Sequence, residues 1–135
     1  MYYINDNGVE QILHFGIENW WISDYSSMDR QMPSEFYLQA IEASEVAVLK
    51  KSVQEELLAK VPKLERYFRA IFQRAYATSQ MRVKYIYTLT REERYHHFTN
   101  SFPGFVQRIP QYMLASYLGF TPEFLSKLRA RKEKQ

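Results

Sequence analysis

The sequence predicts an α+β protein, in which a small antiparallel β unit precedes a long helix and a C-terminal helix-turn-helix. Three observations lead to this fold class. Within the first fifty residues, apolar and polar residues alternate as they do in half-buried strands. After residue 50 the apolar residues recur every three or four positions, as in amphipathic helices. In the last quarter, Gly119 separates two short segments that both have helical spacing.

The β unit is expected over residues 1–50. Four segments have the alternation of strands: residues 1–4, 9–15, 36–41 and 46–49. The first two flank the turn sequence Asn-Asp-Asn-Gly at 5–8, which is a strong hairpin signal. The polar stretch 23–34 is expected to be a loop with room for one helical turn.

Connecting and dimerisation helices are expected over residues 51–79, with a short helix before Pro62 and a longer one after it. Apolar residues on the longer helix alternate spacings of three and four: Val61, Leu64, Phe68, Ile71, Ala75 and Thr78. Such a narrow heptad-like seam favours pairing with a second copy of the chain. The homodimer interface is therefore assigned to Leu64, Phe68, Ile71, Ala75 and Thr78. Packing of the seam on the chain's own β unit is the alternative.

Residues 80–135 are expected to form a helical domain that ends in the helix-turn-helix, with earlier helices at 80–89 and 91–101. Residues 111–118 have helical spacing, and Gly119 ends that helix because glycine reaches positive φ without steric cost. Thr121 is placed to cap the next helix. In this interpretation the second helix lies in the DNA major groove. Its outward residues are the candidates for DNA contact: Thr121, Pro122, Glu123, Ser126 and Lys127, with Arg129 and Arg131 expected at phosphates.

Charge is unevenly distributed along the chain. Residues 1–50 hold two basic and eight acidic residues, whereas residues 51–135 hold sixteen basic and seven acidic ones. A basic C-terminal part is typical of a module that binds phosphates, and a solvated basic surface is the alternative. The absence of cysteine excludes disulfides and thiolate metal sites. No apolar run reaches membrane-spanning length and no signal peptide opens the chain, so we expect a cytoplasmic protein without membrane contact.

The order of these elements resembles the Crp/Fnr family of bacterial transcription regulators. Residues 6–15 are similar to the first strand pair of that family, and residues 40–48 to a later pair. Residues 91–95 and 108–123 are similar to a branch of the family common in Bacteroidetes. The resemblance implies a partial cyclic-nucleotide-binding-like β-roll over 1–50, a homodimer, a DNA operator with two half-sites, and RNA polymerase as a further candidate partner.

Three departures from the family pattern bear on the effector. Members of the family have more strands before the one at Met1, and the chain ends soon after the recognition helix, without the usual wing strands. Classical members hold the nucleotide phosphate with Gly-Glu and Arg-Ser pairs, where this chain has Ser23-Asp24 and Ser34-Glu35. We therefore expect a small-molecule effector other than cyclic AMP. The candidate pocket residues are Trp20, Trp21, Asp24 and Ser34.

The sequence therefore predicts a DNA-binding transcription regulator that is not an enzyme and that holds no metal and no cofactor. No motif pairs a nucleophile with a base, and no phosphate-binding glycine loop is present. A ligand-binding or protein-interaction module with a helix-turn-helix that no longer reads DNA is the alternative.

Overall fold

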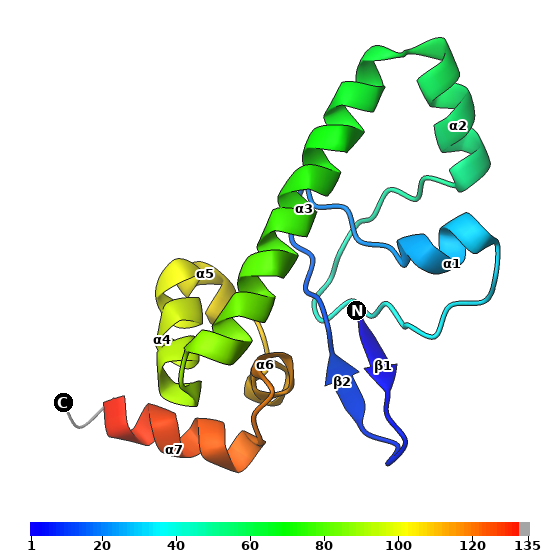
Figure 1. Cartoon of the computed structure of the whole chain (residues 1–135). Coiled ribbons are helices and arrows are strands. Elements are labelled where there is room, and N and C mark those ends of the chain that lie inside the picture. Colours follow the sequence, from blue (N-terminus) through cyan, green and yellow to red (C-terminus); the bar gives the residue numbers. More distant parts are fainter. Residues whose placement is uncertain (133–135) are drawn as a thin grey trace. The chain divides into compact units, whose positions relative to one another are not determined.

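The computed structural model describes residues 1–132, apart from the side chain of Lys132. The elements follow in the order β1 (Tyr2–Ile4), β2 (Glu10–Ile12), α1 (Tyr25–Arg30), α2 (Lys51–Lys60), α3 (Lys63–Thr88), α4 (Arg91–Ser101), α5 (Pro103–Val106), α6 (Gln111–Leu118) and α7 (Pro122–Lys132). Figure 1 shows these helices and the antiparallel pair of β1 and β2. The chain is thus α+β, as expected. Its contacts divide it into one compact unit of residues 1–43 with 91–135 and a second of residues 44–90.

The predicted β-hairpin is present at the start of the first unit. β1 and β2 pair antiparallel, with Tyr3 opposite Gln11. Asn5 closes the turn, because its side-chain Oδ1 accepts hydrogen bonds from the backbone N–H groups of residues 7 and 9, each at 3.0 Å. Gly8 has a φ of +74°, in the left-handed region that glycine adopts at little cost. The hairpin is therefore set by the turn that the sequence indicates.

The second predicted strand pair is wrong. Within the described residues, the segment 36–41 contributes only one β-bridge, between Tyr37 and Tyr2, and residues 46–49 form no strand. Alternation shows that a segment has one apolar face, but a strand also needs a neighbour that accepts and donates its backbone hydrogen bonds. These segments find no such neighbour beyond the Tyr2–Tyr37 bridge, and the sheet of the described residues has only β1 and β2.

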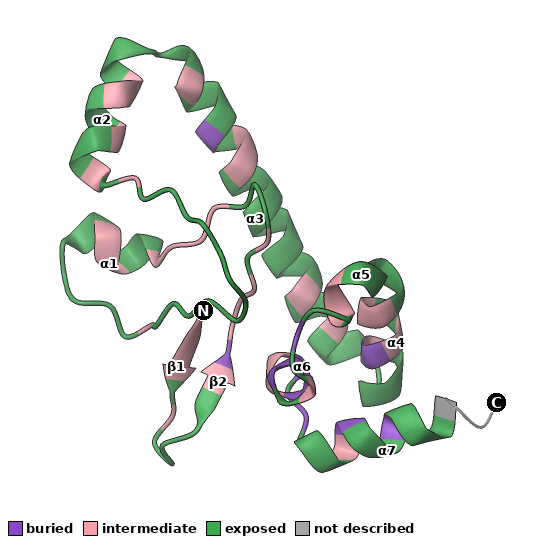
Figure 2. Cartoon of the chain, turned by 180° about the vertical axis from the view of Figure 1, so that it is seen from behind, coloured by how far each residue is buried: buried purple, intermediate pink, exposed green. Residues whose placement is uncertain are grey.

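The predicted break in the long helix is also absent. α3 runs without interruption from Lys63 to Thr88, whereas the sequence predicted one helix to residue 79 and another from residue 80. The helix continues because no glycine or proline stands between its ends. α2 precedes it and packs against it within the second unit. Most of α2 and α3 is exposed, with Phe68 as the buried residue of α3 (Figure 2).

The main hydrophobic core lies in the first unit and joins α4, α6 and α7. It contains Tyr95, Ile109, Leu114, Ala115, Leu118, Phe120, Leu125 and Leu128. Figure 2 shows buried positions on α4, α6 and α7 and in the segments that flank α6. Two short helices that could not bury an apolar stripe alone are thus stabilised by packing on each other.

Candidate nucleic-acid interface

The connection between α6 and α7 follows from three local residues. Gly119 has a φ of +74° and ends α6, with its N–H directed at the carbonyls of Ala115 and Ser116. The N–H of Phe120 also bonds to the Ala115 carbonyl at 2.8 Å, which satisfies the last turn of the helix. Thr121 Oγ1 then accepts a hydrogen bond from the N–H of Phe124 at 3.2 Å. The predicted helix end and helix cap are both confirmed.

The packing between α6 and α7 depends on small and apolar side chains at the positions expected from the sequence. Leu114 and Ala115 are 0% exposed, and Ala115 leaves room for the close approach of the two helices. Phe120, Leu125 and Leu128 are also buried. This side of α7 is therefore committed to the core, and its opposite side faces solvent.

The residues expected to contact DNA are all exposed, with Thr121 just before α7 and the others on it. Thr121, Pro122, Glu123, Ser126, Lys127, Arg129 and Arg131 are all exposed. Glu123, Ser126 and Lys127 lie three and four positions apart, which places them on one helix face. The sequence of α7 carries four basic residues and one carboxylate. Glu123, the single acid, lies in the first turn, where the helix dipole favours a negative charge.

An open hollow of about 410 Å³ lies beside this face. It is lined by Gln111, Pro122, Leu125, Ser126, Arg129 and Ala130. Gln111, the first residue of α6, was not among the residues singled out from the sequence. Its side-chain Oε1 is buried without a protein hydrogen-bond partner. The only sequence signal for Gln111 is its place at the start of a helix, where a side chain can reach a neighbouring surface.

Two arginines of α4 contact α7 and the turn that precedes it. The guanidinium of Arg91 lies 5.5 Å from the ring centre of Phe124, and that of Arg94 lies 5.7 Å from the ring centre of Phe120. Arg94 also donates to the Leu118 carbonyl at 3.3 Å. Cations over aromatic faces attract the ring quadrupole, so these contacts stabilise the packing of α7 and its preceding turn on α4.

The residues expected to line an effector pocket are only partly brought together. Asp24 and Ser34 both line an open hollow of about 390 Å³, and the Ser34 hydroxyl donates to the Asp24 carboxylate at 2.7 Å. Trp20 and Trp21 do not line this hollow. Trp20 is exposed and lies near His14, with 6.3 Å between the ring centres.

Asp24 has a structural role that the sequence did not reveal. Its carboxylate caps α1, because it accepts hydrogen bonds from the backbone N–H groups of Ser26 and Ser27 at 3.2 Å. The hydroxyls of Ser27 and Ser34 also donate to it. These hydroxyl bonds, that of Ser27 first, hold the pKa of Asp24 below its ordinary value. Four donors occupy the acceptor positions of one carboxylate, which leaves it little capacity for a ligand.

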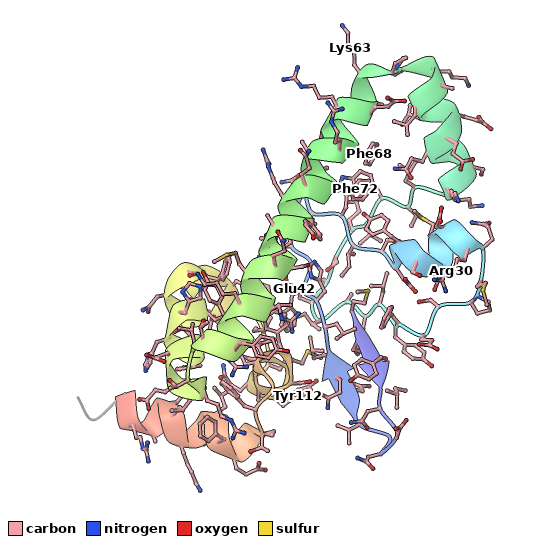
Figure 3. The ribbon with its side chains drawn as sticks, viewed as in Figure 1. Arg30, Glu42, Lys63, Phe68, Phe72 and Tyr112 are labelled. Carbon is pink, nitrogen blue, oxygen red and sulfur yellow. The ribbon has the colours of Figure 1, made fainter. Side chains whose placement is uncertain are left out.

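The expected dimer residues differ in exposure along α3. Phe68 is buried, Leu64 and Ile71 are half-buried, and Ala75 and Thr78 are exposed. The Phe68 ring meets that of Tyr67 edge-on, with 5.2 Å between centres, and stacks on Phe72 one turn further along the helix (Figure 3). The first half of the seam is thus covered in a single chain, and the second half is open.

Comparisons of the chain with protein-family models, with curated proteins and with solved structures give no match. Within residues 1–132, no three histidine, aspartate or glutamate side chains come together as ligands for a metal ion. None of the helices in this part of the chain has both the length and the apolar character needed to cross a membrane.

Proposed function

We propose that the chain is a DNA-binding transcription regulator of the Crp/Fnr type, in which α6 and α7 form the helix-turn-helix. The observation that carries the proposal is the division of α7 into two sides. One side is buried against α6 and α4, and the other presents Glu123, Ser126 and Lys127 to solvent. A recognition helix needs this arrangement, because it must be held rigidly from behind while its outer side chains meet the base edges.

Each outward side chain has a chemistry that suits a base or a phosphate. A carboxylate such as Glu123 accepts a hydrogen bond from cytosine N4, and a long cation such as Lys127 reaches guanine O6 and N7. Ser126 lies on the same face and suits several bases. Arg129 and Arg131 follow on α7 and are assigned to phosphates, which position the helix without reading sequence.

Selection of bound sites from a random DNA pool tests this proposal. Lys127→Ala and Glu123→Ala should each relax the preference at one base pair, by about 1–3 kcal/mol. Lys60→Ala removes an exposed cation outside α7 and is the matched control, with the preferred sequence unchanged. Arg131→Ala should weaken binding to all sequences alike. It should also lower the slope of log affinity against log salt concentration by about one. If the parent chain shows no salt-dependent DNA binding, the alternative of an interaction module with an inactive helix-turn-helix is favoured.

The proposal includes a homodimer that binds an operator with two half-sites about one helical turn apart. The open half of the α3 seam, at Ala75 and Thr78, is the part that remains accessible to a second copy. Ala75→Glu would place a carboxylate in that seam and should give a monomer in sedimentation experiments. Ala77→Glu adds the same charge on the opposite side of α3 and should leave the dimer intact. A parent that remains monomeric at high concentration would remove the homodimer from the proposal.

A cytoplasmic location and a role without catalysis complete the proposal. RNA polymerase is a further proposed partner, through contacts made once the chain is bound to DNA. An effector other than cyclic AMP is proposed for the hollow that Asp24 and Ser34 line, held by the other residues of that hollow, because the Asp24 carboxylate already accepts four hydrogen bonds. Ser34 stands where classical members have the arginine that binds the nucleotide phosphate through two hydrogen bonds. The lack of that strong contact supports an effector other than cyclic AMP. Calorimetry should show no saturable heat with micromolar cyclic AMP.

A further inference from the structure

The hairpin packs against the first helix of the α6–α7 pair, although about a hundred residues separate them in sequence. β2 lies beside α6 (Figure 1). The N–H of Ile12 donates to Ser116 Oγ at 2.9 Å, and the same hydroxyl donates to the Glu10 carbonyl at 3.3 Å. Ile12 and Met113 are both buried, and neither belongs to the main core cluster. The β2–α6 contact therefore has a polar link, and each of the two elements also carries a buried apolar side chain.

Phe15, just after β2, extends this contact into the helical part of the same unit. Its ring meets that of Phe105 edge-on at 5.2 Å and that of Tyr117 at 5.1 Å between centres. Phe98 of α4 lies against the same two rings, at 6.3 Å and 5.3 Å. Four aromatic rings from the N-terminal segment, α4, α5 and α6 thus form one cluster.

Arg108 adds an electrostatic clamp immediately before α6. Its guanidinium binds the Glu18 carboxylate through two nitrogens, at 2.8 Å and 3.1 Å, and it also binds Glu42 (labelled in Figure 3). These bonds, that to Glu18 first, raise the pKa of Arg108 above its ordinary value and lower that of Glu18. Glu18 lies before α1 and Glu42 after it. Arg108 therefore ties both of these segments to the backbone two residues before Pro110, the N-cap of α6.

We propose that the hairpin and the Arg108 clamp regulate the α6–α7 pair by holding α6 in the position that DNA binding needs. α6 has only eight residues, so its position depends on its neighbours rather than on its own stability. β2 is its neighbour on one side and α7 on another. None of the clamp or contact residues belongs to the outward side of α7, so the docked hairpin leaves that side free to bind. Release of the hairpin loosens α6 and lowers DNA affinity, because binding must then restore the lost order.

The DNA part of this inference rests on the proposed function, whereas the coupling between hairpin and α6 does not. The test is the double variant Glu18→Gln/Glu42→Gln, which removes the clamp without touching α6 or α7. Its control, Asp6→Asn/Glu35→Gln, removes two exposed carboxylates from the same unit and makes the same change in net charge. Both variants lose two negative charges relative to the parent, so any general electrostatic gain in DNA binding is matched.

Amide hydrogen exchange measures the coupling, and titration with parent-selected DNA measures its effect. Relative to the control, the clamp variant should speed exchange at Ile12 and along α6 and should raise the Kd by up to about fivefold, the limit expected for exposed ion pairs. Ser116→Ala, which changes no charge, should act in the same direction. If amide hydrogen exchange along α6 were equal in the clamp variant and the control, the coupling between hairpin and α6 would be overturned. Faster exchange with an unchanged Kd would overturn the regulatory role. Faster exchange in a chain whose parent does not bind DNA would instead overturn the proposed function.

Discussion

Replacement of Leu114 by alanine should destabilise the first unit strongly, because this side chain is 0% exposed at the centre of the α6–α7 packing. The change removes three buried carbon groups, at about 0.8 kcal/mol each, which gives roughly 2.4 kcal/mol. The cavity adds a further term that depends on how far the surroundings relax, so the expected loss is about 2.5–5 kcal/mol. Leu38→Ala makes the same chemical change at a side chain that is 59% exposed and should cost about 0.5 kcal/mol or less.

Urea unfolding followed by tryptophan fluorescence is the suitable assay. Both tryptophans, Trp20 and Trp21, belong to the unit that contains Leu114, so their signal reports on that unit. With a urea dependence of about 1–3 kcal/mol/M, a loss of about 3 kcal/mol lowers the midpoint by about 1–3 M. Leu114→Met nearly conserves volume and should lose less than about 1.5 kcal/mol. Equal midpoints for Leu114→Ala and Leu38→Ala would show that this packing does not hold the unit together.

Three further predictions concern single local contacts. Asp24, whose pKa is lowered in the folded chain, contributes stability above its ordinary pKa that is lost as the pH falls through the lowered one. Ser34→Ala should therefore move the pKa of Asp24 back toward its ordinary value in a carboxyl-carbon NMR titration. An unchanged pKa would show that the Ser34 hydroxyl does not lower it. Thr121→Ala removes the acceptor for the Phe124 N–H and should cost about 1 kcal/mol in urea unfolding, whereas Thr121→Ser should not. Gly119→Ala should cost about 1–2 kcal/mol from the positive φ alone, since nothing lies within 4 Å of an added Cβ, and a thermal midpoint equal to the parent's would contradict this.

The helix pair could be predicted from sequence because its signals are local. Gly119, Thr121 and Pro122 act within a few residues of where they stand, and the ends of α6 and α7 follow from their backbone preferences. The buried side of α7 is equally local, since the spacing of Leu125 and Leu128 records one face of a helix. The exposed side, with its proposed DNA contacts, is the remainder of the same pattern.

Pairing between distant segments could not be predicted in this way. The alternation at 36–41 and 46–49 indicates an apolar face but contains no information about a partner strand. The Arg108 clamp joins carboxylates that are 90 and 66 residues away in sequence, and nothing near Arg108 marks it as their partner. Ser116 likewise resembles any polar residue on a helix until β2 is placed beside it.

The hydroxyl of Ser116 also affects how the small sheet behaves toward other chains. An open strand edge presents backbone donors and acceptors that a foreign strand can use, and this is a common start of aggregation. On β2, the N–H of Ile12 and the carbonyl of Glu10 are already bonded to one side chain of α6. The sheet therefore stops growing at that edge because a helix residue occupies the hydrogen-bonding positions of a third strand. If the hairpin separated from α6, these backbone groups of β2 would again be free to pair with a foreign strand. The contact with α6 therefore limits aggregation through this edge as well as positioning the hairpin.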